Sequence, residues 1–510
     1  LPKHTRVRIP AVRQLRYMNP ASKILGEHIL VYMVMCIVVG LWAMRRTKNT
    51  SDFFMAGRHL GVFVTSAAVF ASTMSGFGFV GGPGIAYKNG TSSFWMMVSI
   101  SIGMCIMFFL LGKRLRLLAG LTDSLSVPEV VASRYKSNRT GGLMAIALLP
   151  GVLIYLAVQI KAMAVVLFDL LQDLSWASNV SIEWCFVLCC SVLVFYCVTG
   201  GMVASVYTDF IQGIIMVGAA LLVFYAAMTT LDGGFTEMAQ IITQDDPESM
   251  QPWGTLGMIS CLSIYFIMAL GVCGQPHVIS KLMMTKKPED SRHLLPLSLA
   301  GFMLSAILWV SIGITMRAMV VGDYHQPLVN ADEASSAFLT QYAHPLLAGV
   351  VFAGLFAAIM STADSFLNIG AAAIVNDVPK LLFKRQLNNE LLWARIMTVL
   401  IAVGAALIAY FAEDTVAMLG VMGWSAFAIA FVPTVALGLN WRRANRLGAE
   451  LSVSAGFVVY GILFFKEIAL PFNFHPGAFS LLVTVTVFFL VSIATPPDVI
   501  DRDVEELLEL

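Results

Sequence analysis

Long apolar runs separated by short polar connections make up most of the chain. A helix needs about 20 mostly apolar residues to cross the hydrocarbon core of a bilayer. Membrane strands alternate polar and apolar residues, and these runs do not. The pattern therefore predicts an all-α polytopic membrane protein. Its thirteen expected transmembrane helices lie at 28–46, 61–82, 93–112, 142–171, 182–200, 203–229, 255–280, 295–321, 344–376, 393–412, 415–439, 447–465 and 476–495.

The composition narrows the class further. Hydrophobic residues make up 58% of the 510 residues and charged residues only 12%, whereas soluble proteins average about 25% charged residues. So few charges cannot cover a soluble protein of this size, which argues against a soluble enzyme, a disordered scaffold and a collagen-like rod. The net charge of +1 gives no reason to expect a nucleic-acid partner. The lipid bilayer is the expected surrounding, and no obligate protein partner is evident.

Chemistry-bearing residues give no sign of an enzyme. The eight cysteines lie in apolar runs without the paired spacing of a disulfide framework or a zinc site. The membrane segments contain no recognisable metal-ligand spacing and no Ser/His/Asp set. His277 and His344 each stand next to a proline near a helix end, where capping or packing is the expected role.

The charges in the connections predict an orientation in the plasma membrane. Alternate connections are rich in Lys and Arg, and the others are acidic or neutral. Because basic connections stay on the cytoplasmic side, the N-terminus is expected outside and the C-terminus inside. The basic connections lie at 45–48, 113–139, 281–292, 380–385 and 442–446.

The two ends of the chain are expected to lie outside the helical core. Residues 1–27 are basic but lack the apolar stretch of a signal peptide, so we expect an extension to the fold, with Met18 as an alternative start. Residues 498–510 are acidic and are expected to form a solvated cytoplasmic tail.

Five glycines crowd the end of the second predicted helix. Gly76, Gly78, Gly81, Gly82 and Gly84 follow the small, polar stretch ASTMS. Each glycine costs a helix about 1 kcal/mol relative to Ala. Two interpretations stay open: a break in the membrane that frees backbone carbonyls for an ion, or close packing of helices through small residues.

A second polar cluster lies in the ninth predicted helix. Ala358, Ser361 and Thr362 stand three and four residues apart, so they share one helix face. Two hydroxyls and nearby carbonyls could hold Na⁺, a hard cation that prefers oxygen ligands. The alternative is that each hydroxyl bonds back to the carbonyl four residues earlier.

Two acids lie inside predicted membrane helices, where an ionised carboxylate is costly. Asp209 follows the start of the sixth helix, and Asp364 lies in the ninth. Each could belong to an ion site or to a structural ion pair. Lys161 is the only base that we expect deep in a helix, either neutralising one of these acids or facing a substrate carboxylate.

Seven motifs along the chain resemble those of the sodium:solute symporter family, which includes bacterial proline and pantothenate symporters. The resemblance extends from about residue 28 to about residue 495, and the motifs occur in the family's order. They are DFFMAGRHLG at 52–61, ASTMSG at 71–76, GGPGIAYKNG at 81–90, SVPEVVASRY at 126–135, TGGMVASVYTDFIQG at 199–213, GQPH at 274–277 and AAIMSTADS at 357–365.

The resemblance implies a core of two inverted repeats with five helices each, as in leucine transporters. The first repeat would cover 47–230 and the second 231–440, with 28–46 and 441–497 peripheral. It also implies Na⁺ as the coupling ion. The family's central sodium site corresponds here to Ala71, Met74, Ala358, Ser361 and Thr362.

The resemblance further implies a second sodium or proton site and a substrate site. The second ion site would use Asp209, Ser361, Asp364 and Ser365, with Asp364 in place of a hydroxyl. Candidate substrate contacts are Phe77, Tyr155, Gln159, Met268, Gln275 and Trp424.

Some departures from the family bear on the substrate. Thr73 stands where proline symporters carry an Asp, and Met268 and Val272 replace aromatic residues. We therefore expect a small solute that carries a carboxylate and is similar to pantothenate or to an amino acid such as proline.

The expected function is sodium-coupled symport of this small-molecule substrate into the cell by alternating access. One alternative is a proton-coupled carrier of the same fold, with Asp209 and Asp364 as proton sites. Another is a sensor or channel-like protein that does not pump.

Overall fold

The computed structural model describes residues 31, 34, 38, 60–172 and 179–508. Within this part of the chain the regular structure is helical, apart from one isolated bridge between Leu60 and Thr285. Eleven helices there are long and apolar enough to cross a membrane, and a twelfth apolar helix is shorter. The prediction of an all-α membrane protein is confirmed. The predicted extension 1–27 lies outside the described residues, as does nearly all of the first predicted helix.

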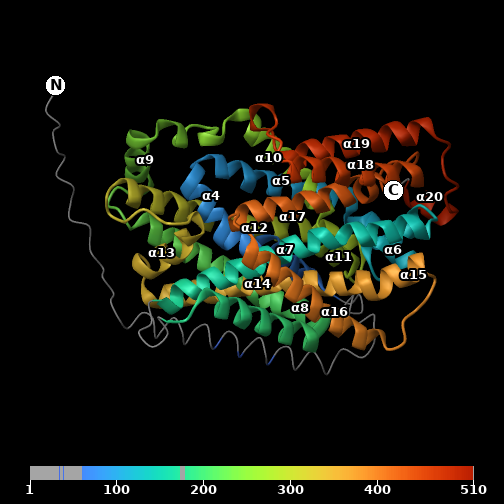
Figure 1. Ribbon diagram of the computed structural model, residues 1–510, viewed down its shortest axis with the longest axis horizontal. Helices are drawn as coiled ribbons and strands as arrows, with labels where there is room; N and C mark the ends of the chain where they lie inside the picture. The colour runs from blue at the N-terminus through green and yellow to red at the C-terminus, as the bar shows by residue number, and fades with distance from the viewer. Residues whose placement is uncertain (1–30, 32–33, 35–37, 39–59, 173–178, 509–510) are drawn as a thin grey trace.

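The membrane helices occur in the predicted order (Figure 1). Several are interrupted by short π or 3₁₀ segments. The membrane helices, with these segments, are α3 (Val62–Gly76) with η2 (Phe77–Gly81) and α4 (Gly82–Asn89), α5 (Ser92–Leu121), α7 (Asn138–Gln172), α8 (Ile182–Met228), α10 (Met258–Gly271) with η5 (Val272–Gly274) and α11 (Pro276–Met283), α12 (Ser291–Val321), α14 (Pro345–Ala372) with η8 (Ala373–Asp377) and α15 (Val378–Leu382), α16 (Glu390–Phe411), α17 (Val416–Phe431) with η9 (Val432–Leu437), α18 (Arg446–Phe465) and α19 (Pro476–Ala494).

Shorter elements connect these helices at the two ends of the molecule. Helices α9 and α13 lie at one end, and α6, α15 and α20 lie at the other (Figure 1). The connecting elements are α6 (Val127–Arg134), α9 (Gly234–Asp245), η3 (Pro247–Met250), η4 (Gly254–Leu256), η6 (Pro288–Asp290), η7 (Ala331–Glu333), α13 (Ala334–Gln341), η10 (Pro471–Asn473) and α20 (Arg502–Leu508).

Helix α8 differs from the prediction of two separate helices at 182–200 and 203–229. It runs without a loop for 47 residues. Two apolar segments within it, Ile182–Phe195 and Ser205–Met228, correspond to the predicted pair. The two residues expected to connect them continue the helix instead. Cys197 and Ser205 both lie near Asp364 of α14, whereas Phe186 packs on Tyr410 and Phe224 packs on Phe235 of α9. The helix therefore bends between its two apolar segments, and these cross the core separately, as predicted.

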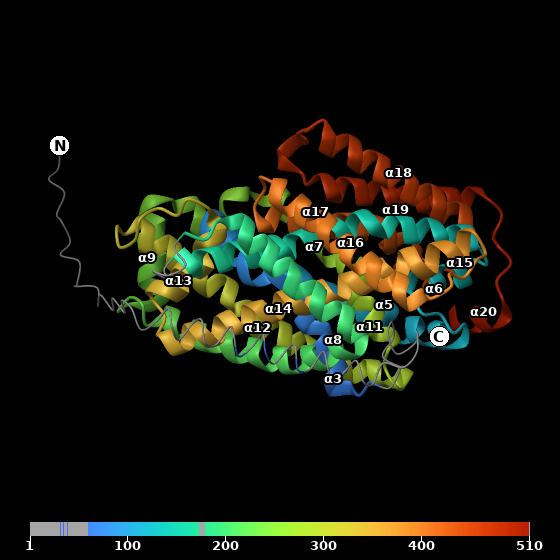
Figure 2. The same ribbon diagram turned by 60° about the horizontal axis from the view of Figure 1, so that its bottom comes forward.

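Helix α3 lies in the middle of the bundle. It packs against α8, α12 and α14, and α14 also packs along α8. Helices α18 and α19 pack against each other at the edge of the molecule (Figure 2). The buried apolar side chains form one large continuous cluster across these helices, so the polar groups buried among them are the natural candidates for function.

Two membrane helices are broken midway. Ser75 has a φ of 36° and a ψ of −179°, which interrupts α3 before the π-helical η2. Gln275 has extended backbone angles between η5 and α11. The break in α3 was one of the two interpretations of the glycine-rich stretch. The break between η5 and α11 was not predicted, although Gly274 and Pro276 flank it and both residues weaken helices.

The glycines also permit close packing, so the second interpretation holds as well. A Cβ atom at Gly82 would lie 2.4 Å from Cδ2 of Trp309, and one at Gly271 would lie 2.2 Å from Nε1 of Trp424. Each distance is far shorter than a normal van der Waals contact. The two broken helices therefore approach large indole rings that a larger residue would displace.

The C-terminal tail is less solvated than predicted. Helix α20 buries Val504 and Leu507, which remain 4% and 3% exposed, and it packs against α5. Ion pairs join Lys136 to Asp501 and Arg442 to Glu505. The tail therefore has an apolar side in addition to its acidic residues.

Arg134 ties α6 to the segment that follows η9. Its side chain is only 2% exposed, although the sequence placed it in a basic connection. Its Nε donates to the Gly438 carbonyl at 2.8 Å, and its Nη2 donates to those of Trp441 and Ala444 at 3.1 and 3.4 Å. The guanidinium thus satisfies carbonyls that the chain leaves free where the helix ends.

Replacing Arg134 with Met should destabilise the fold markedly. Each buried carbonyl left without a donor costs about 1–3 kcal/mol. The midpoint of thermal unfolding in detergent measures this loss. The control is Arg502→Met, which removes an exposed side chain in an i,i+4 ion pair worth about 0.3–0.5 kcal/mol. Equal midpoints for the two variants would contradict this account of Arg134.

Candidate functional site

Side chains from two other helices bind the backbone at the break in α3. In a continuous helix the Gly76 N–H would bond to the Ser72 carbonyl. Here the Gly76 N–H donates to Oε1 of Gln159 on α7 at 2.8 Å. The Ser72 carbonyl accepts from Oγ1 of Thr362 on α14 at 3.1 Å. The two groups released by the break are therefore both satisfied, each by a different helix.

The predicted central sodium residues gather at this break. Ala71 and Met74 lie in α3, and Ala358, Ser361 and Thr362 lie in α14; all five are buried. The bond from α14 to the Ser72 carbonyl brings the two segments together. The Thr362 hydroxyl also contacts the carbonyl four residues earlier at 3.2 Å, which is the alternative bonding considered from the sequence.

One hydroxyl of this group is available for a ligand. Among the described residues, Oγ of Ser361 has no hydrogen-bond partner, although the side chain is 1% exposed. Buried polar atoms are normally satisfied by protein, water or an ion. This hydroxyl lies near the Asp209 carboxylate. A hydroxyl and a carboxylate oxygen suit a hard monovalent cation, so the residues present fit Na⁺.

A buried ion pair lies beside this group. Nζ of Lys281 on α11 is 2.6 Å from Oδ2 of Asp209 on α8, and both side chains are 0% exposed. The ammonium also donates to the Ala68 carbonyl at 3.2 Å and to the Ser72 hydroxyl. The sequence analysis placed Lys281 in a basic connection, because it follows the last apolar residue of the seventh run. That placement was wrong: α11 continues past it and buries it.

The other predicted members of the second ion site lie close by. Oδ1 of Asp364 accepts from Ser205 at 2.8 Å and from Ser365 at 3.3 Å, and Ser365 also bonds to the Ser361 carbonyl. The Ser361 hydroxyl lies near Asp209. The predicted set is thus brought together, but with a lysine among its members.

Lys161 has a role other than the two expected for it. Its ammonium donates to the carbonyl of Ala412, just beyond α16, at 2.8 Å. The acids that attract it are Asp332 and Asp414, and neither is an intramembrane acid of the predicted ion sites. Burial raises the pKa of the Asp332 carboxyl, and its bond from the Val416 N–H opposes that shift. Lys161 therefore holds helix ends together.

Aromatic rings surround Tyr155 on α7. Its hydroxyl is 3.3 Å from Oγ of Ser75, at the break itself. The ring centroid of Tyr155 lies 6.4 Å from that of Trp424 on α17 and 5.1 Å from that of Phe366 on α14. The ring of His277 is tilted by 44° to that of Phe366, with the centroids 4.3 Å apart. Phe366 and His277 were missed as site members, because aromatic residues in apolar runs are usually core.

The remaining predicted substrate residues lie around this ring cluster. Phe77, in η2, packs edge-on against Trp309 with ring centroids 5.6 Å apart. Gln275 sits in the break of the other interrupted helix, and its Nε2 donates to the Gly271 carbonyl at 3.1 Å. Met268 is buried on α10, one turn before the glycine that packs on Trp424.

Several polar atoms of this cluster have no hydrogen-bond partner within the described part of the chain. They are Nε1 of Trp424, Oε1 of Gln275 and both ring nitrogens of His277. All three side chains are nearly fully buried. His277 therefore packs against rings and does not cap a helix, whereas His344 does cap α14 by accepting from the Leu346 N–H.

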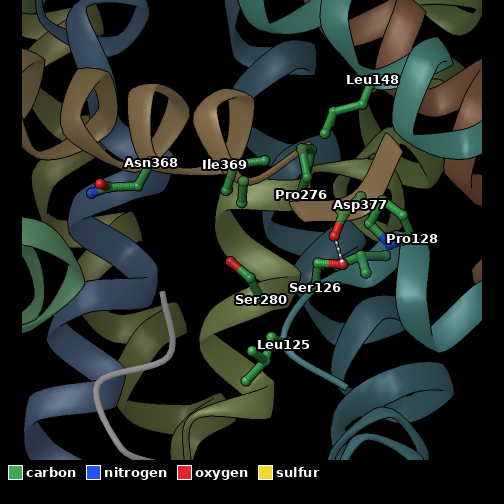
Figure 3. A pocket seen from close by; sticks show the side chains of 11 residues that line it. Leu125, Ser126, Pro128, Leu148, Pro276, Ser280, Asn368, Ile369 and Asp377 are labelled. Atoms are coloured by element: carbon green, nitrogen blue, oxygen red, sulfur yellow. Dashed lines mark hydrogen bonds between the residues drawn. The ribbon is translucent and has the colours of Figure 1, made fainter. Parts of the chain in front are cut away.

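A small cavity lies between α6, α11 and α14 (Figure 3). Its free volume is about 30 Å³, roughly the share of one water molecule. Ser280 on α11 and Asn368 on α14 line it, and among the described residues the Ser280 hydroxyl and the Asn368 amide lack hydrogen-bond partners. Asp377 bonds to Ser126 at 2.8 Å on the other side of the cavity.

This architecture defines a class of protein. Broken membrane helices that enclose buried polar groups at mid-depth are typical of secondary transporters. Both broken helices contribute to one region here, and α14 supplies the oxygen atoms that face the first break. The fold and site therefore define a multi-pass membrane transporter.

The chain belongs to the sodium:solute symporter family, because the family model matches residues 53–456. The sodium/proline symporter 2 of Staphylococcus saprophyticus subsp. saprophyticus is 26% identical over 94% of this chain and 95% of its own length. The sodium/proline symporter of Staphylococcus aureus (strain JH9) is 27% identical with the same coverage. The resemblance predicted from the motifs is confirmed.

Two solved structures show the same fold. A Na⁺-coupled sialic acid symporter in a substrate-bound, outward-open state matches with a TM-score of 0.77 and 18% identity, covering 94% of this chain and 99% of that one. Mhp1, a nucleobase-cation-symport-1 family transporter in a closed conformation, matches with a TM-score of 0.56 and 15% identity, covering 91% and 99%. At these identities the likeness concerns the fold alone.

Membership of this family establishes the general activity of the protein. The chain is a symporter and not an enzyme, and Na⁺ is its coupling ion. The proton-coupled alternative considered from the sequence is therefore not favoured.

Replacing Gln159 with Leu should leave the Gly76 N–H buried without an acceptor, at a cost of about 1–3 kcal/mol. We expect a lower midpoint of thermal unfolding, measured without substrate. Gln172→Leu, on the exposed end of the same helix, is the matched control and should change little. If both variants have the same midpoint of thermal unfolding as the wild type, Gln159 does not stabilise the break.

Proposed function

We propose that the protein imports a small, zwitterionic, amino-acid-like solute together with Na⁺ by alternating access. One observation carries this proposal. The five residues from Ser72 to Gly76 are bonded on one side by Gln159, within the ring cluster, and on the other by Thr362, beside the free hydroxyl. A solute and a cation would therefore act on the same short segment.

The cation site of this proposal consists of the Ala71, Met74 and Ala358 carbonyls with the Ser361 and Thr362 hydroxyls. The Thr362 hydroxyl can donate its proton to the Ser72 carbonyl and still offer lone pairs to Na⁺. Na⁺ would then hold α3 against α14 and fix the break. Because coupling is reciprocal, an ordered break would favour solute binding, and a bound solute would favour Na⁺.

The unpartnered atoms of the ring cluster support a zwitterionic solute. The indole N–H of Trp424 is a donor that suits a carboxylate. The free Oε1 of Gln275 is an acceptor that suits an ammonium. The rings of Tyr155 and Phe77 would cover the apolar part. Two relatives described as sodium/proline symporters add support for an amino acid over pantothenate.

One of the departures from the pattern expected of proline symporters bears on the ammonium of the solute. Thr73 takes the place of an Asp, and its hydroxyl bonds back to the Val69 carbonyl at 2.8 Å. We therefore assign the ammonium of the solute to Gln275, which is neutral, and expect a weaker preference for a secondary amine.

The two breaks support the proposed inverted repeat. They lie in the second and seventh of the thirteen predicted helices, so equivalent positions are offset by five helices. We propose a first repeat over 47–230 and a second over 231–440, in a plasma-membrane protein with its N-terminus outside and its C-terminus inside. The basic connections support this orientation.

The energetics suffice for accumulation with one sodium ion. One Na⁺ gains about 2.3 kcal/mol in a potential of 100 mV, and a tenfold gradient adds about 1.4 kcal/mol. Together these support roughly 500-fold accumulation of a solute without net charge. A zwitterion meets that condition, whereas an anionic solute would lose the voltage contribution.

Uptake into proteoliposomes tests the function directly. A panel of radiolabelled proline, other small amino acids, pantothenate and sialic acid should show uptake of an amino acid that needs an inward Na⁺ gradient. Uptake of pantothenate or sialic acid alone would contradict the proposed substrate class. Amino-acid uptake that a pH gradient drives at zero Na⁺ would contradict the proposed coupling.

Removing either hydroxyl of the cation site should raise the Na⁺ concentration for half-maximal uptake. We expect about a tenfold rise for Ser361→Ala and for Thr362→Ala, which corresponds to about 1.4 kcal/mol for one lost ligand. Ser480→Ala is the control, because this buried hydroxyl on α19 only bonds back to Pro476. Sodium dependence like the wild type in both test variants would end the site assignment.

A further inference from the structure

The buried lysine of α11 has the ligands that a second metal cation would need. Nζ of Lys281 contacts three oxygen atoms: a carboxylate oxygen of Asp209, the Ala68 carbonyl and the Ser72 hydroxyl. Carboxylate, carbonyl and hydroxyl oxygens are also the donors that a hard metal cation takes from proteins. The ammonium is 0% exposed, so it competes with no water for them.

This ammonium is adjacent to the proposed cation site. Ser72 is shared by both: its hydroxyl meets Lys281, and its carbonyl accepts from Thr362. Asp209 is also placed between them, since Oδ2 pairs with the lysine while Oδ1 has no hydrogen-bond partner among the described residues and Ser361 lies near. The lysine thus stands within the set predicted for a second sodium ion.

The charges of this region balance with one mobile cation. Two carboxylates, Asp209 and Asp364, lie in it, and both side chains are at most 1% exposed. Lys281 supplies one fixed positive charge. A buried region is most stable without net charge, because uncompensated charge in the membrane interior is costly. One fixed ammonium and one Na⁺ neutralise two carboxylates, whereas two Na⁺ would leave an excess positive charge.

We propose that Lys281 is a built-in cation that takes the place of a second sodium ion, so that this symporter binds and couples one Na⁺. The inference rests on the proposed cation site and deepens it, because it assigns the ion count. It also gives Lys281 a positioning role: the ammonium holds α11 of the second broken helix against α3 of the first. Both broken helices are then tied at the point where Na⁺ acts.

Sodium binding to purified protein tests this without any knowledge of the substrate. Equilibrium binding of ²²Na⁺ in detergent should saturate at one ion per wild-type chain. Lys281→Met frees the Asp209 carboxylate and should admit a second ion, so binding should saturate at two. Lys281→Arg keeps the charge and should bind one. In the double variant Asp209→Asn with Lys281→Met, both charges are gone and binding should return to one.

A control variant and a transport measurement distinguish a specific effect of Lys281 from a general effect of removing a lysine. Lys380→Met removes a lysine that pairs with Glu129 at 2.7 Å at the far end of the fold, and it should bind one ion like the wild type. In proteoliposomes, the ratio of ²²Na⁺ to solute taken up should be one for the wild type and should rise in Lys281→Met if that variant transports.

Each result decides for or against the proposal. Two ions bound by the wild type would overturn it, whatever the variants do, and so would one ion bound by a folded Lys281→Met protein. If Lys281→Met does not give a monodisperse protein, the wild-type count and the neutral double variant decide. A wild type that binds no Na⁺ would instead refute the cation site itself, and with it the proposed function.

Discussion

The structure depends on one exchange of hydrogen bonds at the break in α3. A helix that loses its bond between Ser72 and Gly76 inside a membrane must find other partners for both groups, because lipid offers none. Gln159 and Thr362 supply them from α7 and α14. The break is thereby maintained by two helices at once, and any ligand that changes either contact changes the geometry of the whole crossing.

The ring cluster and the ionic cluster follow from that constraint. Tyr155 contacts Ser75 at the break, and Gln159 accepts from the Gly76 N–H. Lys281 donates to the Ser72 hydroxyl, and Thr362 donates to the Ser72 carbonyl. The groups proposed to bind the solute and those proposed to bind Na⁺ therefore contact the same short segment at different residues. Thermodynamic coupling between two such sites needs only that each ligand favour the same arrangement of the segment.

The sequence predicted much of this arrangement, and the failures have physical reasons. The length of apolar runs predicted the membrane helices, because lipid requires them. The hydroxyl of Thr362 meets the Ser72 carbonyl of α3, whereas that of Ser361 lies near Asp209. The role of Lys281 could not be predicted, since a lysine at the end of an apolar run looks like an interfacial residue. Its burial depends on α11 continuing after the second break. The continuous helical backbone of α8 has a similar cause, because a short gap between two apolar segments can be a sharp bend without a loop.

The most direct test of the central claim is hydrogen–deuterium exchange of the protein in nanodiscs, with Na⁺ and with choline in its place. We predict that Na⁺ slows amide exchange in peptides covering 72–81 and 358–365, because the ion joins these segments, while peptides from α18 and α19 exchange as before. Exchange at the break that is the same in both salts would contradict the account, since Na⁺ would then not act on the interrupted helix.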